Sequence, residues 1–258
     1  MSSKDLQTNS EPQAPVAIFA FSGWNDAGDA GTTALGYIQK ASNSSVFSKI
    51  DSQGYFDFTV TRPEVSYQPD GSRLITWPDF EFQQGFCGFS QELITGFGAE
   101  PHFRWNEYCD RFVNLLKELG VRRVALLGAF LADVLYSLPV QITGFATDPK
   151  VVFDLDLKTS NYQGPTGIVG VLSTRLQDEG FDVASMWAGL PHYVNASPNP
   201  RGALALVQKV TNFLDLKIDE IPLSKAAADY EERISALVAS DPNLAEYVKE
   251  LKRREFAQ

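Results

Sequence analysis

The stretch that decides the fold is "VAIFAFS" at residues 16–22, followed directly by "GWNDAGDAG" at residues 23–31. An uninterrupted apolar run of this length is typical of a strand buried on both faces of a parallel sheet. The glycines after it permit a sharp turn, and Ala30, Ala34 and Ile38 then recur at the spacing of a helix from about residue 26 to residue 41. A buried strand, a tight turn and a crossover helix predict an α/β fold.

The rest of the chain continues this alternation. Helical spacing marks residues 105–120, 166–179 and 200–214. Strand-like apolar runs cover residues 46–50, 55–60, 73–78, 91–98, 122–130, 138–147, 151–157 and 181–190. Strands that alternate with crossover helices predict a mainly parallel sheet flanked by helices on both faces.

The chain is expected to have three parts. Residues 1–14 are polar and predict a disordered leader, residues 15–222 form the α/β domain, and residues 223–258 predict a C-terminal helical hairpin. Within the hairpin an apolar stripe recurs at helical spacing through Leu244, Tyr247, Val248 and Leu251. Such a stripe either packs on its own domain or binds a partner, and the sequence leaves both interpretations open.

Composition restricts the classes of partner. The formal net charge is −10, from 32 acidic and 22 basic residues, which argues against nucleic acid because neutralising phosphates needs clustered cations. No apolar run approaches the roughly 20 residues that span a bilayer, so no membrane partner is expected. The two cysteines, Cys87 and Cys109, form neither a CxxC pair nor a disulfide scaffold, and a reducing cytoplasm is the expected setting.

Several polar or glycine-bearing turns each follow a predicted strand. They therefore gather at the carboxyl ends of the sheet, the edge where open α/β sheets bind ligands. The candidate cleft residues on these turns are Trp24, Asn25, Asp26, Asp133, Gly164, Thr166, His192 and Tyr193.

The acidic pair Asp26 and Asp29 has two interpretations. Asp26 stands at the expected N-cap of the first helix, and Asp29 stands three residues later, where a carboxylate also complements the helix dipole. Capping accounts for both acids, whereas acid–base or metal chemistry remains the alternative. Thr166 is likewise a candidate N-cap, and free N–H groups at that helix start could hold an anion.

Signatures of chemistry are weak throughout. The chain has no GxxxxGK[ST] phosphate loop, no GxSxG nucleophile elbow and no HExxH pair. His102 and His192 are its two histidines, and neither cysteine is their neighbour in sequence. We therefore assign no catalytic residue, no metal ligand and no cofactor, and the balance leans against an enzyme.

One segment is unusually aromatic. Residues 77–105 carry eight aromatic side chains within a glycine-rich, irregular pattern. These aromatics form either a satellite core under a long loop or the buried centre of a protein interface. The interface interpretation predicts a homo-oligomer, with three as the expected number of copies. Its candidate interface residues are Trp77, Phe80, Phe82, Phe86, Phe89, Phe103 and Trp105.

The motifs "GWNDAGDA", "YFDFTVTRPEV", "DGSRLITWP", "GAEPHFRW", "GPTGIVG", "GLPHYV" and "PNPRGALAL" occur in this order. Together they resemble the proteasome assembly chaperone 2 family, in particular its branch in high-GC Gram-positive bacteria, from about Val16 to Leu214. The resemblance implies a fold like that of the purine nucleoside phosphorylases. It also implies homo-oligomers and, in eukaryotic and archaeal relatives, binding to proteasome α subunits.

Two departures bear on the proteasome partner. Relatives often carry a segment like "DVPHTRP" where this chain has "DVLYSLP" at residues 133–139, so Tyr136 and Leu138 replace a histidine and an arginine. Chaperones that dock into α-subunit pockets can end in a hydrophobic–tyrosine–any-residue tail, whereas this sequence ends in "REFAQ".

Two hypotheses of function follow. The first is a non-catalytic, oligomeric protein-binding module of the assembly-chaperone kind. The second is an enzyme that acts on a small nucleoside-like or peptidyl substrate with Asn25, Asp26, Asp133 and His192. Fold alone does not decide between them.

Overall fold

The computed structural model describes residues 14–87, 91–194 and 196–255. The predicted leader therefore lies almost wholly outside the described residues, and so does Phe89. The strands are β1 (Val16–Ser22), β2 (Ser45–Ile50), β3 (Glu64–Tyr67), β4 (Arg73–Thr76), β5 (Phe80–Cys87), β6 (Gln91–Ala99), β7 (Arg123–Ala132), β8 (Ile142–Ala146) and β9 (Asp182–Pro191). The helices are η1 (Ala27–Asp29), α1 (Ala30–Ala41), α2 (Trp105–Glu118), α3 (Pro149–Asp154), α4 (Ile168–Asp178), α5 (Pro200–Leu214), α6 (Ile221–Ser240) and α7 (Pro242–Glu255).

A seven-stranded sheet with the order β2-β5-β6-β1-β7-β9-β8 forms the centre of the molecule. Strands β6, β1, β7 and β9 are parallel neighbours, whereas β2, β5 and β8 pair antiparallel at the two sides. The sheet is therefore mixed, and the expectation of a mainly parallel sheet holds only for its middle. The difference arises because β5 and β6 follow each other without a crossover helix.

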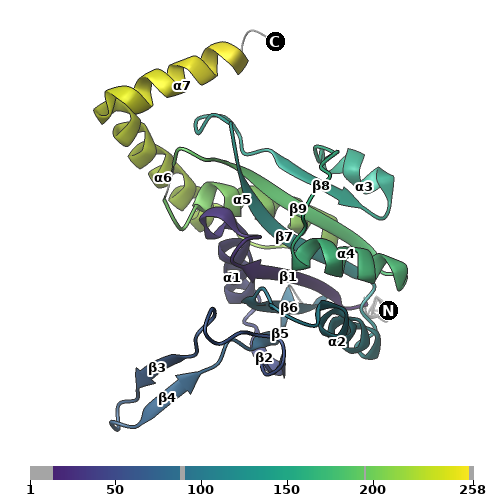
Figure 1. Ribbon diagram of the computed structural model, residues 1–258. Helices are drawn as coiled ribbons and strands as arrows, with labels where there is room; N and C mark the ends of the chain where they lie inside the picture. Colours follow the sequence, from purple (N-terminus) through teal and green to yellow (C-terminus); the bar gives the residue numbers. More distant parts are fainter. Residues whose placement is uncertain (1–13, 88–90, 195, 256–258) are drawn as a thin grey trace, which may run out of the picture.

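Helices cover both faces of this sheet (Figure 1). On one face α1 and α5 pack on Val16, Ile18 and Ala20 of β1, and on the other α2 and α4 pack on Ala17, Phe19 and Phe21. All six side chains are at most 2% exposed. The apolar run that opens the sequence is thus a strand buried on both faces, as predicted.

Two predicted strands are wrong. Residues 55–60 form turns, because the carboxylate of Asp57 accepts hydrogen bonds from the backbone N–H and the hydroxyl of Thr59. Residues 151–157 overlap α3, which begins at Pro149 and is capped by Asp148 through a 2.8 Å bond from the N–H of Lys150. In both places a local polar cap outweighs the apolar pattern.

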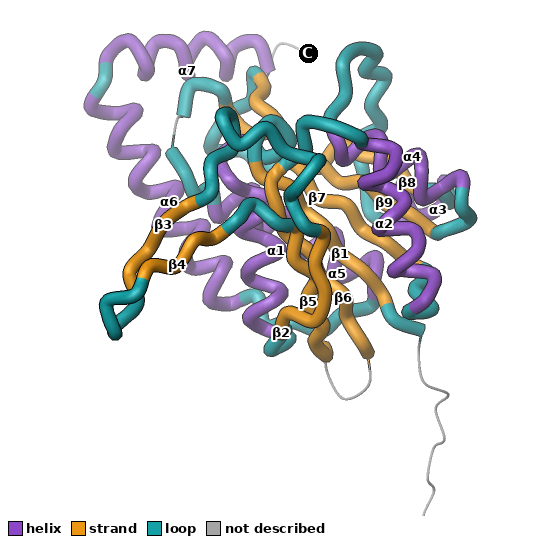
Figure 2. The backbone as a smooth tube through the Cα atoms, turned by 60° about the horizontal axis from the view of Figure 1, so that its bottom comes forward, coloured by secondary structure: helices purple, strands orange, loops and turns teal. Residues whose placement is uncertain are grey.

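Two features extend from this body. The β3–β4 hairpin projects away from the sheet, as Figures 1 and 2 both show. At the other end of the molecule α6 and α7 form a helical arm that joins the body through a third apolar cluster. That cluster contains Leu244, Tyr247, Val248 and Leu251, so the predicted stripe packs within the chain.

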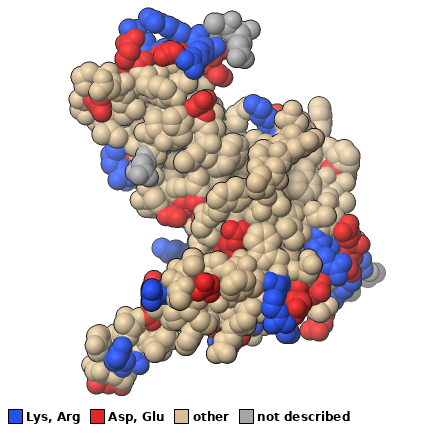
Figure 3. Space-filling view, in the orientation of Figure 1, with Lys and Arg blue, Asp and Glu red and all other residues tan. Residues whose placement is uncertain are grey.

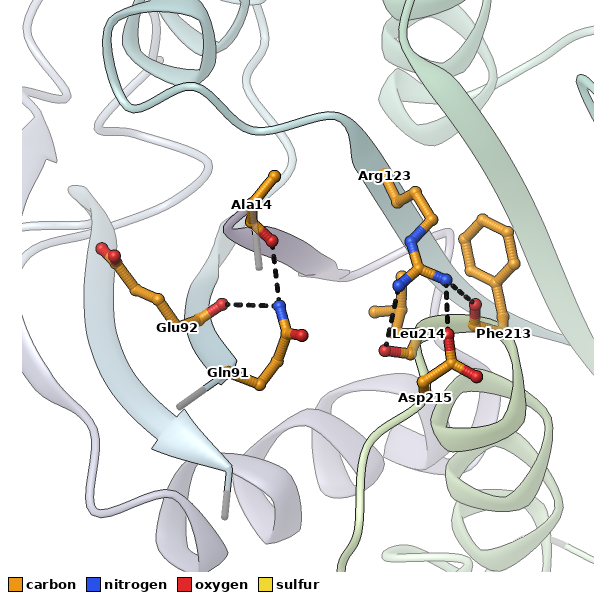
Figure 4. A network of polar contacts seen from close by, with 7 residues as sticks. All are labelled: Ala14, Gln91, Glu92, Arg123, Phe213, Leu214 and Asp215. Carbon is orange, nitrogen blue, oxygen red and sulfur yellow. Dashed lines mark hydrogen bonds and ion pairs between the residues drawn. The ribbon is translucent and has the colours of Figure 1, made fainter. Parts of the chain in front are cut away.

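The amino-terminal edge of the sheet is held by side-chain bonds to backbone carbonyls (Figure 4). Arg123 at the start of β7 donates to the carbonyl oxygen of Phe213 and to Asp215, both at 2.9 Å. Gln91 at the start of β6 donates to the carbonyl oxygen of Ala14 at 3.0 Å. The contacts of Arg123 hold the end of α5 at this edge. The candidate site lies at the opposite edge, where the loops after the parallel strands meet. Among the described residues, no helix is both long and apolar enough to cross a membrane.

Candidate functional site

The carboxyl ends of β1, β6, β7 and β9 meet at one edge of the sheet, because these strands are parallel. Strand β1 is followed by η1 and α1 on one face, whereas its neighbour β6 is followed by α2 on the other. The connections that follow these two adjacent strands therefore run to opposite faces of the sheet. This is the arrangement at which α/β sheets form a crevice. The predicted cleft residues at this edge fall into two separate clusters.

The first cluster lies behind β1 and is buried. Asp26 is 5% exposed, and its carboxylate accepts hydrogen bonds from the N–H groups of Gly31 (2.6 Å) and Thr32 (3.1 Å) and from the Thr32 hydroxyl (2.5 Å). Burial raises the pKa of Asp26, although the bonds from Thr32 and Gly31 act against that rise. Asp26 thus caps α1, as the capping interpretation predicts, but it does so across the turn of η1 instead of from the N-cap position.

The N-cap position of α1 belongs to Asp29, which has left-handed backbone geometry with φ of 49°. Its side chain makes no capping bond and instead accepts a hydrogen bond from the Ser197 hydroxyl, on the loop after β9. The predicted position of Asp29 inside the helix is therefore wrong. The reason is the positive φ of Gly28, which breaks the helix before Ala30.

Asn25 lies beside Asp26 and is fully buried. Neither polar atom of its amide has a hydrogen-bond partner among the described residues. The amide faces Gly167, the N-cap of α4, so closely that a Cβ on Gly167 would come within 2.1 Å of Asn25 Oδ1 and 2.8 Å of Glu100 Oε1. Glu100 in turn accepts a 2.6 Å bond from the N–H of Ile168 and satisfies the start of α4.

Glu100 was missed by the sequence analysis, which assigned the cap of α4 to Thr166. Thr166 and Gly164 lie exposed on the loop before α4, and Trp24 is 65% exposed after β1. A carboxylate already occupies the helix start at which an anion was considered. The first cluster thus has two parts, the buried Asn25 with the half-buried Glu100 at the start of α4 and Asp26 at the start of α1, and the other predicted residues of these loops lie outside it.

The second cluster lies behind β7 and β9 and is accessible. His192 Nε2 lies 2.8 Å from Asp133 Oδ1 and 2.8 Å from the hydroxyl of Tyr247 on α7, and that hydroxyl also donates to Asp133 at 3.3 Å. The Tyr193 hydroxyl donates to the carbonyl oxygen of Val134 at 3.0 Å, and the rings of Tyr193 and Tyr247 are 5.3 Å apart. Tyr247 comes from the helical arm, and no sequence pattern linked it to Asp133 or His192.

Burial raises the pKa of the Tyr247 hydroxyl, and the Asp133 carboxylate raises it further. Tyr247 is thus held as a neutral hydrogen-bond donor and acceptor. A neutral phenol between a histidine and a carboxylate fastens the arm to the body, and its raised pKa makes it a poor nucleophile.

Two hollows adjoin this second cluster. A pocket of about 450 Å³ lies between η1 and the loop after β9, and Asp29, Leu131, His192, Ser197 and Asn199 are among the residues that line it. A groove of about 740 Å³ runs between residues 133–142, α5 and α6. Asp29, Ser197 and His192 therefore line one pocket at the carboxyl edge, and Asp133, 2.8 Å from His192, lines the neighbouring groove.

The described residues offer neither a metal site nor a reactive Cys109 thiol. Among the residues that the structure describes, no group of three or more His, Cys, Asp or Glu side chains could hold a metal ion. Cys109 is buried, and that burial raises the pKa of its thiol to about 12, so it carries almost no thiolate near neutral pH.

The aromatic residues predicted at an interface divide between core and surface. Phe80 and Phe82 are at most 1% exposed and pack against Phe112, so the interface assignment is wrong for these two. The "FEF" pattern of β5 alternates inward and outward, and this period of two was the missed signal. Trp105 is half-buried, with its indole N–H donating to Pro101 O at 2.7 Å.

The remaining described residues of that set are exposed: Trp77 by 43%, Phe86 by 56% and Phe103 by 50%. Two of them belong to an aromatic patch, which we define as Phe58, Trp77, His102 and Phe103. The rings of Phe58 and Trp77 lie 4.9 Å apart and those of His102 and Phe103 lie 6.1 Å apart. A 2.9 Å bond from the Asp57 N–H to His102 Nδ1 joins the two halves.

Comparisons with known proteins agree with this architecture. The model of the PAC2 family matches residues 20–238. A proteasome-assembly chaperone homologue of Mycobacterium tuberculosis is 34% identical, with 90% of this chain and 99% of that chain covered and a TM-score of 0.83. A PAC2 family protein of Streptomyces avermitilis is 37% identical, with coverages of 91% and 99% and a TM-score of 0.84.

A more distant structure shares the fold. PbaA of Pyrococcus furiosus, an archaeal homologue of a proteasome-assembly chaperone, is 18% identical, with coverages of 94% and 97% and a TM-score of 0.62. No curated protein matches the chain. The family resemblance that the sequence motifs indicated is confirmed, and its two more similar structures come from Mycobacterium and Streptomyces, as the high-GC Gram-positive branch predicts. The chain belongs to the PAC2 family.

Proposed function

We propose that this chain is a non-catalytic, self-associating protein-binding module of the assembly-chaperone kind, acting in the cytoplasm. The observation that carries the proposal is the aromatic patch of Phe58, Trp77, His102 and Phe103. Its rings contact one another in two pairs, Phe58 with Trp77 and His102 with Phe103, and Trp77 and Phe103 are 43% and 50% exposed. Clustered exposed aromatics are typical of the energetic centre of protein interfaces.

The polar clusters are consistent with the same function. In the first cluster Asp26 and Glu100 satisfy helix starts within the chain. In the second, Tyr247 of the arm contacts His192, which is itself paired with Asp133. Without Tyr247, His192 would be the best candidate for a general base, with Asp133 as the carboxylate that orients it. We treat residues 223–258 as a helical appendage. It contacts the body through the side chains of the second cluster.

A proteasome subunit is the partner class that the similar proteins suggest, and we take an α subunit because the family resemblance implies it. The printed descriptions of similar proteins name proteasome-assembly chaperones and, for PbaB of Pyrococcus furiosus, an archaeal proteasome activator. The loop residues Tyr136 and Leu138 depart from relatives, so the aromatic patch is the surface that we assign to the partner.

The test uses purified proteasome α subunits from the source organism. Wild-type chain is expected to co-elute with them in gel filtration, and Trp77→Ala combined with Phe103→Ala is expected to weaken binding at least about tenfold, as for hot-spot aromatics. Tyr162→Ala is the matched control, because Tyr162 is 66% exposed on the loop before α4. Binding that the double variant leaves unchanged would remove the patch from the proposal, and no wild-type binding would remove the α subunit as partner.

A second candidate function rests on the pocket of about 450 Å³ beside Asp133 and His192. A histidine held by a carboxylate can act as a general base. The phosphorylase-like fold implied by the family makes a nucleoside-like or peptidyl substrate the class to try. Turnover of a nucleoside and peptide panel by wild-type protein, lost in His192→Ala, would favour this enzyme over the binding module.

A further inference from the structure

The β3–β4 hairpin has one apolar face that nothing in the described chain covers. Val65 pairs with Ile75 and Tyr67 pairs with Arg73, so these four side chains share one face of the hairpin. Val65, Tyr67 and Ile75 are 51%, 74% and 52% exposed. In the space-filling view most of the hairpin surface, at lower left, is uncharged between its tip and its root (Figure 3).

This arrangement is unfavourable for an isolated hairpin. Two strands without a covering layer are marginally stable in water, and alternation places apolar side chains on one face in order to bury them. The opposite face carries Glu64, Ser66 and Thr76, which are suited to solvent, with Leu74 as its one apolar side chain. The hairpin is therefore built to lie against another surface, and it projects away from its own body (Figure 2).

The chain presents a second uncovered surface at the same end of the sheet. Phe97 of β6 lies directly opposite Glu81 of β5, and Val46 of β2 lies opposite Gln83 on the same face. Phe97 is 44% and Val46 52% exposed, because the helix on this face, α1, reaches β6 only farther along, where Gln39 donates to Thr95. This is an open sheet face with an apolar centre, and we call it the β5–β6 face.

Charge matches the two surfaces to each other. Arg73 makes no ion pair within the described residues, and Glu81 makes none either. Lys49 lies opposite Glu81 in register, but its ammonium is bonded to Asp79 at 2.6 Å. The β5–β6 face thus retains one negative charge, whereas the hairpin face offers one arginine.

We propose that the apolar face of the β3–β4 hairpin docks on the β5–β6 face of a second copy of this chain, with Arg73 opposite Glu81. This inference rests on the self-association of the proposed function and names its surfaces. When two copies, in place of the three expected from the sequence, exchange hairpins about a two-fold axis, each buries its hairpin and its sheet face at once. The reciprocal exchange doubles the area that one hairpin would bury, and this favours it because a stable interface needs roughly 800 Å² per copy.

The test exploits the reciprocity of the contact. Arg73→Glu and Glu81→Arg each place like charges together at both contacts, so each alone is expected to weaken self-association about tenfold or more in sedimentation equilibrium. An equimolar mixture of the two variants is expected to re-associate, because each hairpin then meets a face of opposite charge. The double variant is expected to associate like wild type for the same reason.

Glu64→Arg is the matched control, since it makes the same charge change as Glu81→Arg on the solvent face of the hairpin. Its self-association is expected to equal that of wild type, and thermal melts of all variants verify folding. Association that survives both single reversals, or a mixture that stays dissociated, would overturn the hairpin contact. A monomeric wild type would also remove self-association itself, whereas binding of α subunits through the aromatic patch would be unaffected.

Discussion

Asp26 and Asp133 are both acidic residues at the carboxyl ends of neighbouring parallel strands, and the structure gives them opposite roles. Asp26 is 5% exposed and its partners are donors of α1, within six positions of the sequence. Asp133 is exposed, and its partners are His192 of the next loop and Tyr247 of the arm. The same residue type after a strand thus stabilises the fold in one place and joins two segments in the other, according to what packs over it.

Gly167→Ala, at the buried cluster, is the substitution for which we expect the largest effect on stability. A methyl group there would lie 2.1 Å from Asn25 Oδ1 and 2.8 Å from Glu100 Oε1, where Asn25 is fully buried and Glu100 is bonded to the N–H of Ile168. We expect a loss of about 3 kcal/mol in the free energy of unfolding, at the upper end of overpacking effects. Urea denaturation measures it.

Gly36→Ala is the control for that substitution, because Gly36 lies within α1 and a Cβ there meets nothing within 4 Å. Alanine at this position is expected to stabilise the protein by about 0.5–1 kcal/mol. If Gly167→Ala were as harmless as Gly36→Ala, the buried cluster would be loosely packed, and the contrast with the open cluster would fail.

The next test is Asp26→Asn. Both carboxylate oxygens accept bonds, so the amide of asparagine would turn an N–H group toward either Gly31 or Thr32. We expect a loss of about 1–2 kcal/mol, larger than an exposed N-cap would give, because a buried donor is left unpaired. A loss near zero by urea denaturation would show that Asp26 acts as an ordinary exposed cap.

The pH dependence of Asp26 gives a smaller effect with a defined sign. Its folded-state pKa is raised above the ordinary aspartate value of 3.8, first by burial. The folded state therefore binds the Asp26 proton more readily than the unfolded state does, and this contribution to stability falls as pH rises through the interval just above 3.8. The stability advantage of wild type over Asp26→Asn should shrink across that interval, and an advantage that grows would contradict the raised pKa.

Much of the fold was predictable from local patterns. The buried run of β1, the amphipathic α2 and the proline-initiated α5 all carry their signal within one segment. The errors occurred where short polar caps compete with apolar runs, as at Asp57 and Asp148. The antiparallel β5 was misjudged because its inward phenylalanines alternate with polar residues across a stretch that also contains glycine.

The candidate site was predictable in its location but not in its contacts. Strand ends placed Asp26, Asp133 and His192 at one edge of the sheet, as the topology confirms. The bond from Ile168 to Glu100 joins positions 68 apart, and that from Tyr247 to Asp133 joins positions 114 apart. Neither link has a spacing or motif in one sequence, since helix packing alone brings these groups together.

The smallest expected effect concerns the open cluster, through Tyr247→Phe. Phenylalanine keeps the ring contacts with His192 and Tyr193 and removes only the hydroxyl that meets His192 and Asp133. We expect global unfolding to change little, while amide hydrogen exchange in α7 becomes about two- to fivefold faster, as the loss of a modest hydrogen bond predicts. Tyr162→Phe, whose hydroxyl bonds only to Pro165 O of its own loop, is expected to leave α7 exchange unchanged. Unchanged α7 exchange in Tyr247→Phe would mean that apolar packing alone holds the arm. Asp133 would then have no structural partner in the arm, and the pair of Asp133 and His192 would be free for chemistry in the adjoining pocket.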